Sequence, residues 1–181
     1  MATIAVKTEE NIDYKGRFER EAFPPPYTVT SAISHATCTT AHDLGAVAII
    51  TVTKSGETAK MISKHRPICP IISFTTSHKI YNQLALSWGV HPMMIEELDS
   101  TDRLFERTVQ IATEDGLLEN GDLVVITAGV PLGVSGTTNL LKVHLVGHIL
   151  ASGIGSLPVS VCGNLCVCQH DSDLAKNFKD G

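Results

Sequence analysis

The sequence lacks the features that mark several common classes of protein. No apolar run reaches the about 18 residues that a membrane-spanning helix requires, so no membrane segment is predicted. The N-terminus does not have the charged-then-apolar layout of a secretory signal. No basic cluster occurs and the formal net charge is -5, so no nucleic-acid-binding surface is predicted.

The cysteines do not form a disulfide framework. There are five of them, an odd number, and their spacing fits no disulfide scaffold, so we predict reduced thiols in a cytoplasmic protein. Cys38 and Cys69 are expected to be small core residues. A cluster near the C-terminus contains Cys162, Cys166, Cys168 and His170. Its spacing differs from that of zinc sites, so no metal site is predicted.

Recognisable catalytic sets are also missing. The chain contains no evident Ser-His-Asp set, pair of catalytic carboxylates or dinucleotide-binding fingerprint. His35 and His42 share one predicted helix and are interpreted as surface histidines. Trp88 is interpreted as a core or interface residue. The sequence therefore predicts no catalytic residue.

What the sequence does contain is a regular alternation of strand and helix patterns. Hydrophobic residues make up 43% of the chain, which is enough for a substantial core. Strands are predicted at Ala46–Val52, Pro70–Thr75, Val90–Ile95, Asp122–Thr127 and Asn139–Val146. Helices are predicted from the cap Thr30 to Gly45 and at Glu57–His65, Ser77–Trp88 and Thr101–Asp115. This alternation predicts an α/β fold with a mostly parallel sheet covered on both faces.

The sequence makes more detailed predictions for the first two helices of the chain. Residues 1 to about 18 are typical of a helix, which the proline run after Phe23 separates from the rest. In the helix that ends at Gly45, three-and-four spacing predicts an inward face made of Ile33, Ala36, Thr37, Thr40, Ala41 and Leu44.

The first candidate site follows the strand Ala46–Val52. Thr53-Lys-Ser-Gly-Glu-Thr58 leads directly into a helix, whose first-turn N–H groups and dipole favour an anion such as phosphate. A purely structural interpretation also fits these residues. Ser55 or Thr58 could cap the helix, Glu57 could complement its dipole, and Lys54 could be a solvated surface charge.

A second glycine-rich loop follows the strand Asp122–Thr127. It contains Gly129, Gly133, Ser135, Gly136 and Thr137 and no charged residue. Such a loop lets the backbone approach a ligand closely and can form a concavity of N–H groups. The alternative is a long connection to an edge strand.

Winding rules bring the two loops together. If the winding direction reverses after the third strand, the strand order is 3-2-1-4-5 and the first and fourth strands are neighbours. Both loops then lie at the carboxyl edge of the sheet, where α/β proteins bind ligands. The strand Asn139–Val146 alternates polar and apolar residues and is predicted to be an antiparallel edge strand.

Several separated motifs resemble the C-terminal domain of pyruvate kinase. They are Thr53-Lys-Ser-Gly56, His65-Arg-Pro67, Pro70-Ile-Ile72, Gly121-Asp-Leu-Val-Val125, Thr127-Ala-Gly-Val-Pro131 and Gly136-Thr-Thr-Asn139. The resemblance implies a three-layer α/β/α sandwich over residues 24–150, preceded in 1–23 by a remnant of the last barrel helix. Residues 151–181 resemble the start of a C-terminal extension in some bacterial enzymes, which is similar to a phosphohistidine domain.

The resemblance also implies a site. The family binds a phosphorylated effector at the loop that matches Thr53, Lys54, Ser55, Gly56 and Thr58. The second loop, with Gly129, Gly133, Ser135, Gly136 and Thr137, would cover it. Glu57 stands where animal enzymes that bind fructose 1,6-bisphosphate commonly carry a basic residue. This favours a monophosphate effector, either a nucleotide such as AMP or a sugar monophosphate.

The same resemblance implies what the chain lacks. Pyruvate kinase transfers phosphate from phosphoenolpyruvate to ADP on a β/α barrel with magnesium and potassium, and no catalytic residue of that barrel matches this chain. The chain is therefore expected to be a piece of a cytoplasmic enzyme and to be inactive alone. Its expected roles are to regulate the enzyme and to pair subunits through Asn139–Val146. A purely structural oligomerisation domain without an effector is the alternative, and an autonomous enzyme is a weaker third hypothesis.

Overall fold

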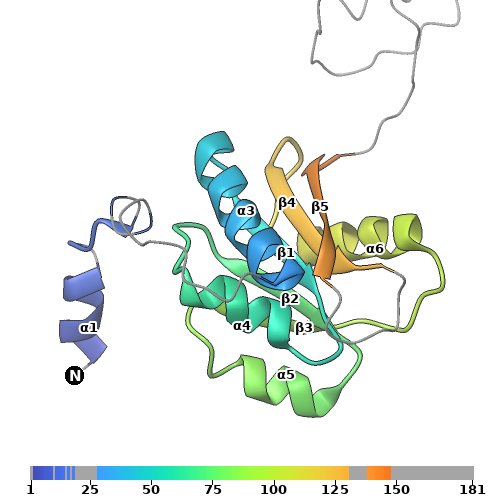
Figure 1. The fold of residues 1–181 in the computed structure, drawn as a ribbon, viewed down its shortest axis with the longest axis horizontal. Helices are drawn as coiled ribbons and strands as arrows, with labels where there is room; N and C mark the ends of the chain where they lie inside the picture. Colours follow the sequence, from blue (N-terminus) through green and yellow to red (C-terminus); the bar gives the residue numbers. More distant parts are fainter. Residues whose placement is uncertain are drawn as a thin grey trace, which may run out of the picture. The chain divides into compact units, whose positions relative to one another are not determined.

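The computed structural model describes residues 2–9, 11–14, 16, 18, 28–130 and 138–147. All of them belong to the compact unit Met1–Gly147. The helices are α1 (Ala2–Glu9), α3 (Val29–Leu44), α4 (Glu57–Lys64), α5 (His78–Leu84) and α6 (Thr101–Glu114) (Figure 1). The strands are β1 (Ala48–Val52), β2 (Ile71–Thr75), β3 (Val90–Met94), β4 (Leu123–Gly129) and β5 (Thr138–Leu145).

The five strands form one sheet in the order β3-β2-β1-β4-β5. The pairs β1–β2, β1–β4 and β2–β3 are parallel, and β4–β5 is antiparallel. The predicted strand order and the antiparallel edge strand are therefore confirmed. The reversal of winding places β4 directly beside β1, with Thr51 opposite Thr127.

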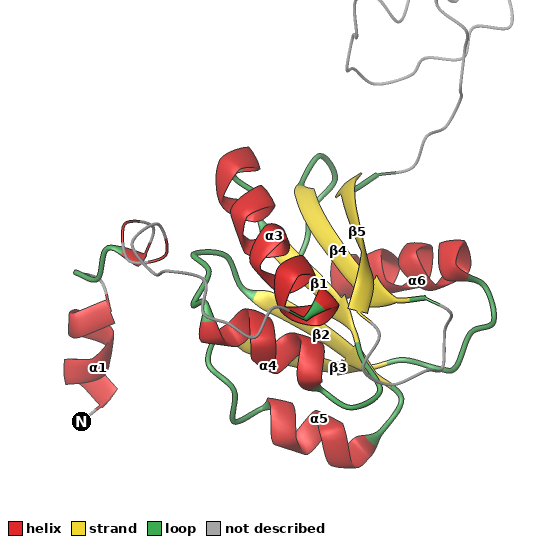
Figure 2. Cartoon of the chain, in the orientation of Figure 1, coloured by secondary structure: helices red, strands yellow, loops and turns green. Residues whose placement is uncertain are grey.

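Helices cover the sheet in two layers (Figure 2). Helix α6 packs on one face, where its buried side chains meet alternate residues of the strands. Helices α3, α4 and α5 contribute to the core on the other face, with Cys38, Ile62 and Leu84 among the buried residues. The three-and-four spacing of Leu104, Phe105, Val109 and Ala112 along α6 predicts an inward face, and all four residues are buried. The α/β/α arrangement of layers follows from these contacts.

The strands differ in burial according to their place in the sheet. All residues of β2 are buried, as are most of β1 and β4, because helices cover both faces of the central strands. The residues of the edge strand β5 are mostly half-buried or exposed, with Val143 and Leu145 among the exposed ones. Their backbone and apolar side chains leave this edge suited to pairing with another strand.

The opposite edge is less suited to strand addition. The amide of Ile71 donates to the carbonyl of Gly89, and the amide of Ile95 donates to that of Thr75. Since backbone groups alternate in direction along a strand, Pro92 falls at a position directed away from β2. A proline there has no N–H to offer an incoming strand, which is typical of a protected edge.

Helix α3 departs from its predicted boundaries and face. It begins at Val29, and its cap is Thr28 rather than Thr30. The Thr28 hydroxyl accepts from the Ser31 amide at 3.1 Å and the Ser31 hydroxyl accepts from the Thr28 amide at 2.9 Å, so a capping box fixes this start. The pattern at Thr30 cannot provide this reciprocal pair.

The buried face of α3 consists of small residues instead of the predicted stripe. Ser31, Ser34, Thr37, Cys38 and Ala41 are buried. Of the predicted stripe only Thr37 and Ala41 are buried, and Leu44 is 49% exposed. Small side chains let a helix approach the sheet closely, so packing overrides the apolar pattern here.

Two other helices end earlier than predicted. The predicted helix Ser77–Trp88 is only seven residues long, His78–Leu84, and Leu86 beyond it is 91% exposed. Helix α1 ends at Glu9, short of the predicted residue 18. The proline run after Phe23 lies outside the described residues.

The two described cysteines lie in the core, as predicted. Cys38 is fully buried and Cys69 is 9% exposed, and both are free thiols. Burial raises the pKa of the Cys38 thiol to about 12 and that of Cys69 to about 11. Neither thiol is therefore poised for ionisation near neutral pH. Cys162, Cys166, Cys168 and His170 lie outside the described residues.

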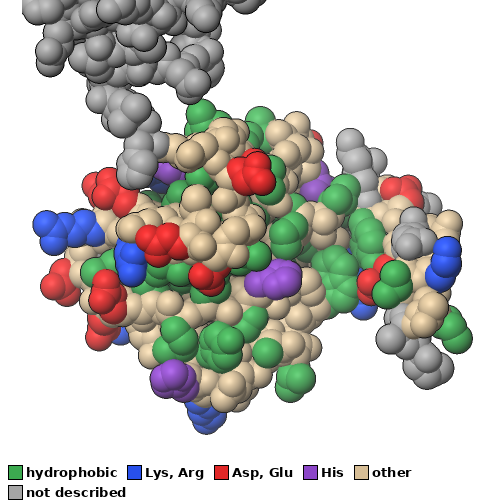
Figure 3. Space-filling view, turned by 180° about the vertical axis from the view of Figure 1, so that it is seen from behind, with side chains coloured by type: hydrophobic (Ala, Val, Ile, Leu, Met, Phe, Trp, Pro, Cys, Tyr) green, Lys and Arg blue, Asp and Glu red, His purple; other side chains and the backbone are tan. Residues whose placement is uncertain are grey.

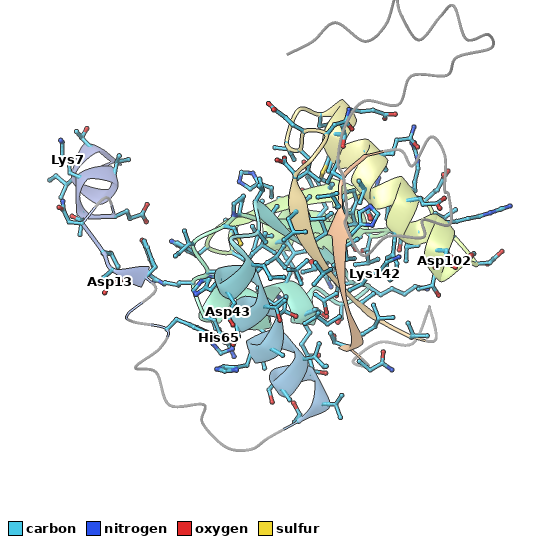
Figure 4. The ribbon with its side chains drawn as sticks, turned by 90° about the horizontal axis from the view of Figure 1, so that it is seen from above. Lys7, Asp13, Asp43, His65, Asp102 and Lys142 are labelled. Carbon is cyan, nitrogen blue, oxygen red and sulfur yellow. The ribbon has the colours of Figure 1, made fainter. Side chains whose placement is uncertain are left out.

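Charged side chains are distributed over the described surface. On the face seen in Figure 3, acidic and basic side chains are interspersed. Figure 4 shows Lys142 on the α6 side of the sheet, where its Nζ lies 5.3 Å from the centroid of the Phe105 ring. His65 and Asp43 lie on the side of α3 and α4. None of the helices in the described ranges has the length and apolarity needed to span a bilayer.

Candidate functional site

The two predicted loops begin at one edge of the sheet. Because β1 and β4 are parallel neighbours, their carboxyl ends lie side by side. Thr53 follows β1 directly, and Gly129 ends β4. Gly129 is also paired with Thr138, the first residue of β5, at a register shift between Ala128 and Gly129. The expected convergence of the two segments is therefore present at their described ends.

A tight turn connects β1 to α4. The Thr53 hydroxyl accepts a hydrogen bond from the Gly56 amide at 2.9 Å, and Thr53 is 8% exposed. Gly56 has a φ of 79°, a left-handed conformation that favours glycine. The Gly56 Cα also faces Ile80 and Leu84 of α5 so closely that a Cβ would lie 3.1 Å from Ile80 Cγ2. Thr53 and Gly56 thus set the direction in which α4 starts.

The start of α4 lacks a side-chain cap. Its N-cap is Gly56, which has no side chain to offer. The Ser55 hydroxyl lies 3.4 Å from the Glu57 amide, a long contact. The next amides of the first turn, those of Thr58 and Ala59, have no acceptor within the helix. These N–H groups and the helix dipole favour a negative ligand at this position.

A direct contact ties α4 to the edge strand. The hydroxyl oxygens of Thr58 and Thr138 lie 2.5 Å apart, and both residues are buried. The two residues are far apart in the sequence, so this bond fixes the start of β5 against the first turn of α4. The Thr58 hydroxyl is consequently held within the protein.

The base of the second loop is also fixed. The Asn139 side chain accepts from the Val130 amide at 2.8 Å and donates to the Val130 carbonyl at 2.5 Å. These bonds join the residues on either side of 131–137. Gly133, Ser135, Gly136 and Thr137 lie outside the described residues, so their predicted role stays a prediction.

Lys54 has an acidic partner. Its Nζ lies 2.5 Å from Oε1 of Glu97, which follows β3 at the same edge of the sheet. The side chains of Lys54 and Glu97 are 41% and 69% exposed. The hydrogen bond and the positive charge of Lys54 hold the pKa of the Glu97 carboxyl below its ordinary value.

The geometry sorts the predicted phosphate-binding residues into two groups. Thr53, Gly56 and Thr58 are buried and belong to the turn. Lys54 and Ser55 remain accessible enough to meet a ligand. The assignment of all of them as phosphate ligands stays a prediction.

Sequence reasoning did not identify Glu97, which the fold brings to the site. Glu97 lies in an acidic stretch after β3, and the pairing of Thr138 with Thr58 was likewise not predicted. The position of Glu97 at the carboxyl end of a parallel strand could have been used to find it.

A different hollow lies at the far edge of the sheet. It has a volume of about 600 Å³, and its lining includes His78, His91 and Asp115 beside β3. The Asp115 carboxylate disfavours an anionic ligand there. Across the described ranges, no group of three or more His, Cys, Asp or Glu residues could hold a metal ion.

Comparison with known proteins identifies the family of this domain. Residues 31–144 match the family described as "Pyruvate kinase, alpha/beta domain". The chain belongs to this family. The match covers all five strands except the end of β5, together with the turn after β1.

The relatives of this pyruvate kinase domain are bacterial enzymes named pyruvate kinase. The chain is 39% identical to the enzyme of Lactobacillus delbrueckii subsp. bulgaricus and 37% identical to that of Geobacillus stearothermophilus, in both cases over 100% of its length. It is 47% identical to the enzyme of Clostridium acetobutylicum over 81% of its length. The chain spans 31% of the length of each of these relatives.

A solved structure agrees with these matches. The structure of Cryptosporidium parvum pyruvate kinase in complex with ADP superposes with a TM-score of 0.67 and 30% sequence identity. The superposition covers 75% of the chain and 28% of that protein. The predicted family and fold class are thus confirmed.

Proposed function

We propose that this chain is the regulatory part of a pyruvate kinase and that it binds a phosphorylated effector at the turn Thr53–Thr58. The observation that carries the proposal is the uncapped start of α4 at the carboxyl edge of the sheet. Its neighbours Lys54 and Ser55 supply a positive charge and a hydroxyl donor. Membership of the pyruvate kinase alpha/beta-domain family and the bacterial relatives support it.

The phosphate would interact mainly with backbone. The amides of Thr58 and Ala59 and the hydroxyl of Ser55 can donate to phosphate oxygens. Lys54 would approach from the side of β3. The hydroxyls of Thr53 and Thr58 contribute indirectly, because their protein partners Gly56 and Thr138 fix the turn and the base of the second loop.

The acidic surroundings favour an effector with a single phosphate. Glu57 is exposed at the first position of α4, and Glu97 lies beside Lys54. Each carboxylate repels a second phosphate group nearby. We therefore expect a nucleotide monophosphate such as AMP, or a sugar monophosphate, to bind better than fructose 1,6-bisphosphate.

Ser55→Asp tests this site. The new carboxylate lies at the phosphate position and is expected to weaken binding by about 1–4 kcal/mol, the range for charges a few ångströms apart near a protein surface. Isothermal titration of AMP, ribose 5-phosphate, glucose 6-phosphate and fructose 1,6-bisphosphate against both proteins measures the effect.

The matched control is Ser87→Asp. Ser87 is half-buried like Ser55 but lies between α5 and β3, at the amino edge of the sheet. The Ser87→Asp variant adds the same charge far from the proposed site, so it should leave the affinity for the phosphate compounds unchanged. Equal affinity in wild type and Ser55→Asp would place the effector elsewhere.

The edge strand β5 supports a second role in assembly. Its outer side is free of a neighbouring strand within the described sheet, and Val143 and Leu145 are exposed on it. We propose that two copies pair through the predicted segment Asn139–Val146. Sedimentation with and without each phosphate compound separates the roles. A dimer that binds none of the compounds would favour assembly alone.

The remaining proposals concern the whole enzyme to which this domain would belong. We propose that it transfers phosphate from phosphoenolpyruvate to ADP in the cytoplasm, using magnesium and potassium on residues outside this chain. The chain alone is expected to be inactive. Turnover by the purified chain would contradict this division and favour an autonomous enzyme.

A further inference from the structure

The ion pair between Lys54 and Glu97 joins two loops at the carboxyl edge of the sheet. Lys54 follows β1 and Glu97 follows β3, 43 positions later in the chain. The distance of 2.5 Å between Nζ and Oε1 places the carboxylate directly on the ammonium group. Lys54 is also the cation nearest in sequence to the uncapped start of α4.

This pair creates a conflict for an arriving phosphate. A lysine ammonium attracts phosphate as a point charge, but a carboxylate in contact with it cancels most of that charge. A phosphate that reaches Lys54 also approaches Glu97 and is repelled by it. The phosphate and the Glu97 carboxylate therefore compete for the ammonium group of Lys54.

We infer that Glu97 is an internal competitor for Lys54, which it holds until an effector phosphate displaces it. The inference rests on the proposed effector site at Thr53–Thr58. Glu97 then lowers the affinity of the domain for its effector. It also favours doubly charged phosphate groups over anions of lower charge. It determines the effector concentration at which the domain responds.

The neighbouring Glu96 provides a matched comparison. Its side chain has the same exposed fraction as Glu97, 69%, but its partner is Arg107 of α6 at 3.9 Å. Replacing either glutamate by glutamine removes one charge from the same loop. Only the change at Glu97 frees Lys54.

The pKa of Glu97 offers a readout that affinity alone does not. In the free protein, Lys54 holds the pKa of this carboxyl below its ordinary value. When phosphate takes Lys54, the carboxyl loses its partner and gains a negative neighbour. Its pKa should then rise.

The test measures binding of inorganic phosphate and ribose 5-phosphate to the full chain, its Glu97→Gln and Glu96→Gln variants, and Ser55→Asp. Glu97→Gln should bind both probes about two- to fivefold more tightly, a gain in line with the modest strength of exposed ion pairs. Glu96→Gln should match the wild type. Carboxyl NMR with saturating phosphate should record the rise in the Glu97 pKa.

The outcomes distinguish the inference from the site on which it rests. If Ser55→Asp weakens binding but Glu97→Gln equals Glu96→Gln or binds more weakly, the competitor role is wrong and the effector site stands. Weaker binding by Glu97→Gln would mean that Glu97 orients Lys54 for the ligand. If Glu97→Gln binds a probe and the wild type and the other variants do not, the inference is supported. If no variant binds either probe, both proposals are wrong.

Discussion

Replacement of Phe74 by alanine is expected to lower the free energy of unfolding by about 3–5 kcal/mol. Phe74 lies in the middle of the sheet on β2, opposite Val52 of β1 and Met93 of β3. Its side chain is fully buried in the core that α6 covers. Truncation removes apolar contacts on both sides and leaves a cavity that the flanking strands cannot close. Urea denaturation followed by circular dichroism measures the change.

The control for Phe74→Ala is Leu86→Ala. Leu86 is 91% exposed, so its truncation should change the free energy of unfolding by less than about 0.5 kcal/mol. A loss below about 1 kcal/mol for Phe74→Ala would contradict the packing described for this core.

Gly56→Ala is expected to destabilise the domain by about 2–5 kcal/mol and to weaken phosphate binding. The φ of 79° costs a residue with a Cβ about 1–2 kcal/mol. The new Cβ would also lie 3.1 Å from Ile80 Cγ2 and 3.3 Å from Leu84 Cδ2. Leu84 is fully buried, so relief of this contact requires movement of α4 or α5, and such overpacking costs about 1–3 kcal/mol.

Gly45→Ala separates the two contributions. Gly45 ends α3 with a φ of 62°, but nothing lies within 4 Å of the position of its Cβ. Its substitution should therefore cost only the conformational part, about 1–2 kcal/mol, and leave phosphate affinity unchanged. Thermal unfolding and phosphate titration of both variants test this. Equal stability of the two would mean that the close approach of α5 to Gly56 does not constrain the turn.

The parts of the fold that the sequence predicts best are those where one physical requirement dominates. The central strands are covered on both faces, so their continuous apolar runs are unambiguous. Gly45 and Gly116 have positive φ and lie within two residues of the ends of α3 and α6, where glycine is typical of a helix C-terminus. Winding rules then leave few strand orders, and the observed order is the predicted one.

Prediction was weaker where packing competes with the apolar pattern. In α3, the buried residues include Ser31, Ser34 and Cys38, which the predicted inward face did not contain. The cap at Thr28 depends on a reciprocal hydrogen bond to Ser31. Thr30 and Ser31 are hydroxyl residues that could also cap a helix, so the sequence alone does not show which residue precedes α3. Such choices depend on how closely the helix approaches the strands.

The site was predictable only in part for a related reason. The turn after β1 has a local signal, because a polar stretch joins a buried strand to a helix. The partners of this turn are distant in sequence. Thr138 reaches Thr58 and Glu97 reaches Lys54 only after the sheet has assembled. Pairwise contacts of this kind leave no periodic trace in the sequence.

The central claim is that the turn after β1 binds a phosphate through its backbone amides. A titration of the ¹⁵N-labelled chain with inorganic phosphate, followed by amide chemical shifts, tests this most directly. The largest saturable shifts are expected at the amides from Ser55 to Ala59, with a smaller response at Gly129. Shifts that are absent from this turn, or that concentrate around Ser87 at the amino edge of the sheet, would contradict it.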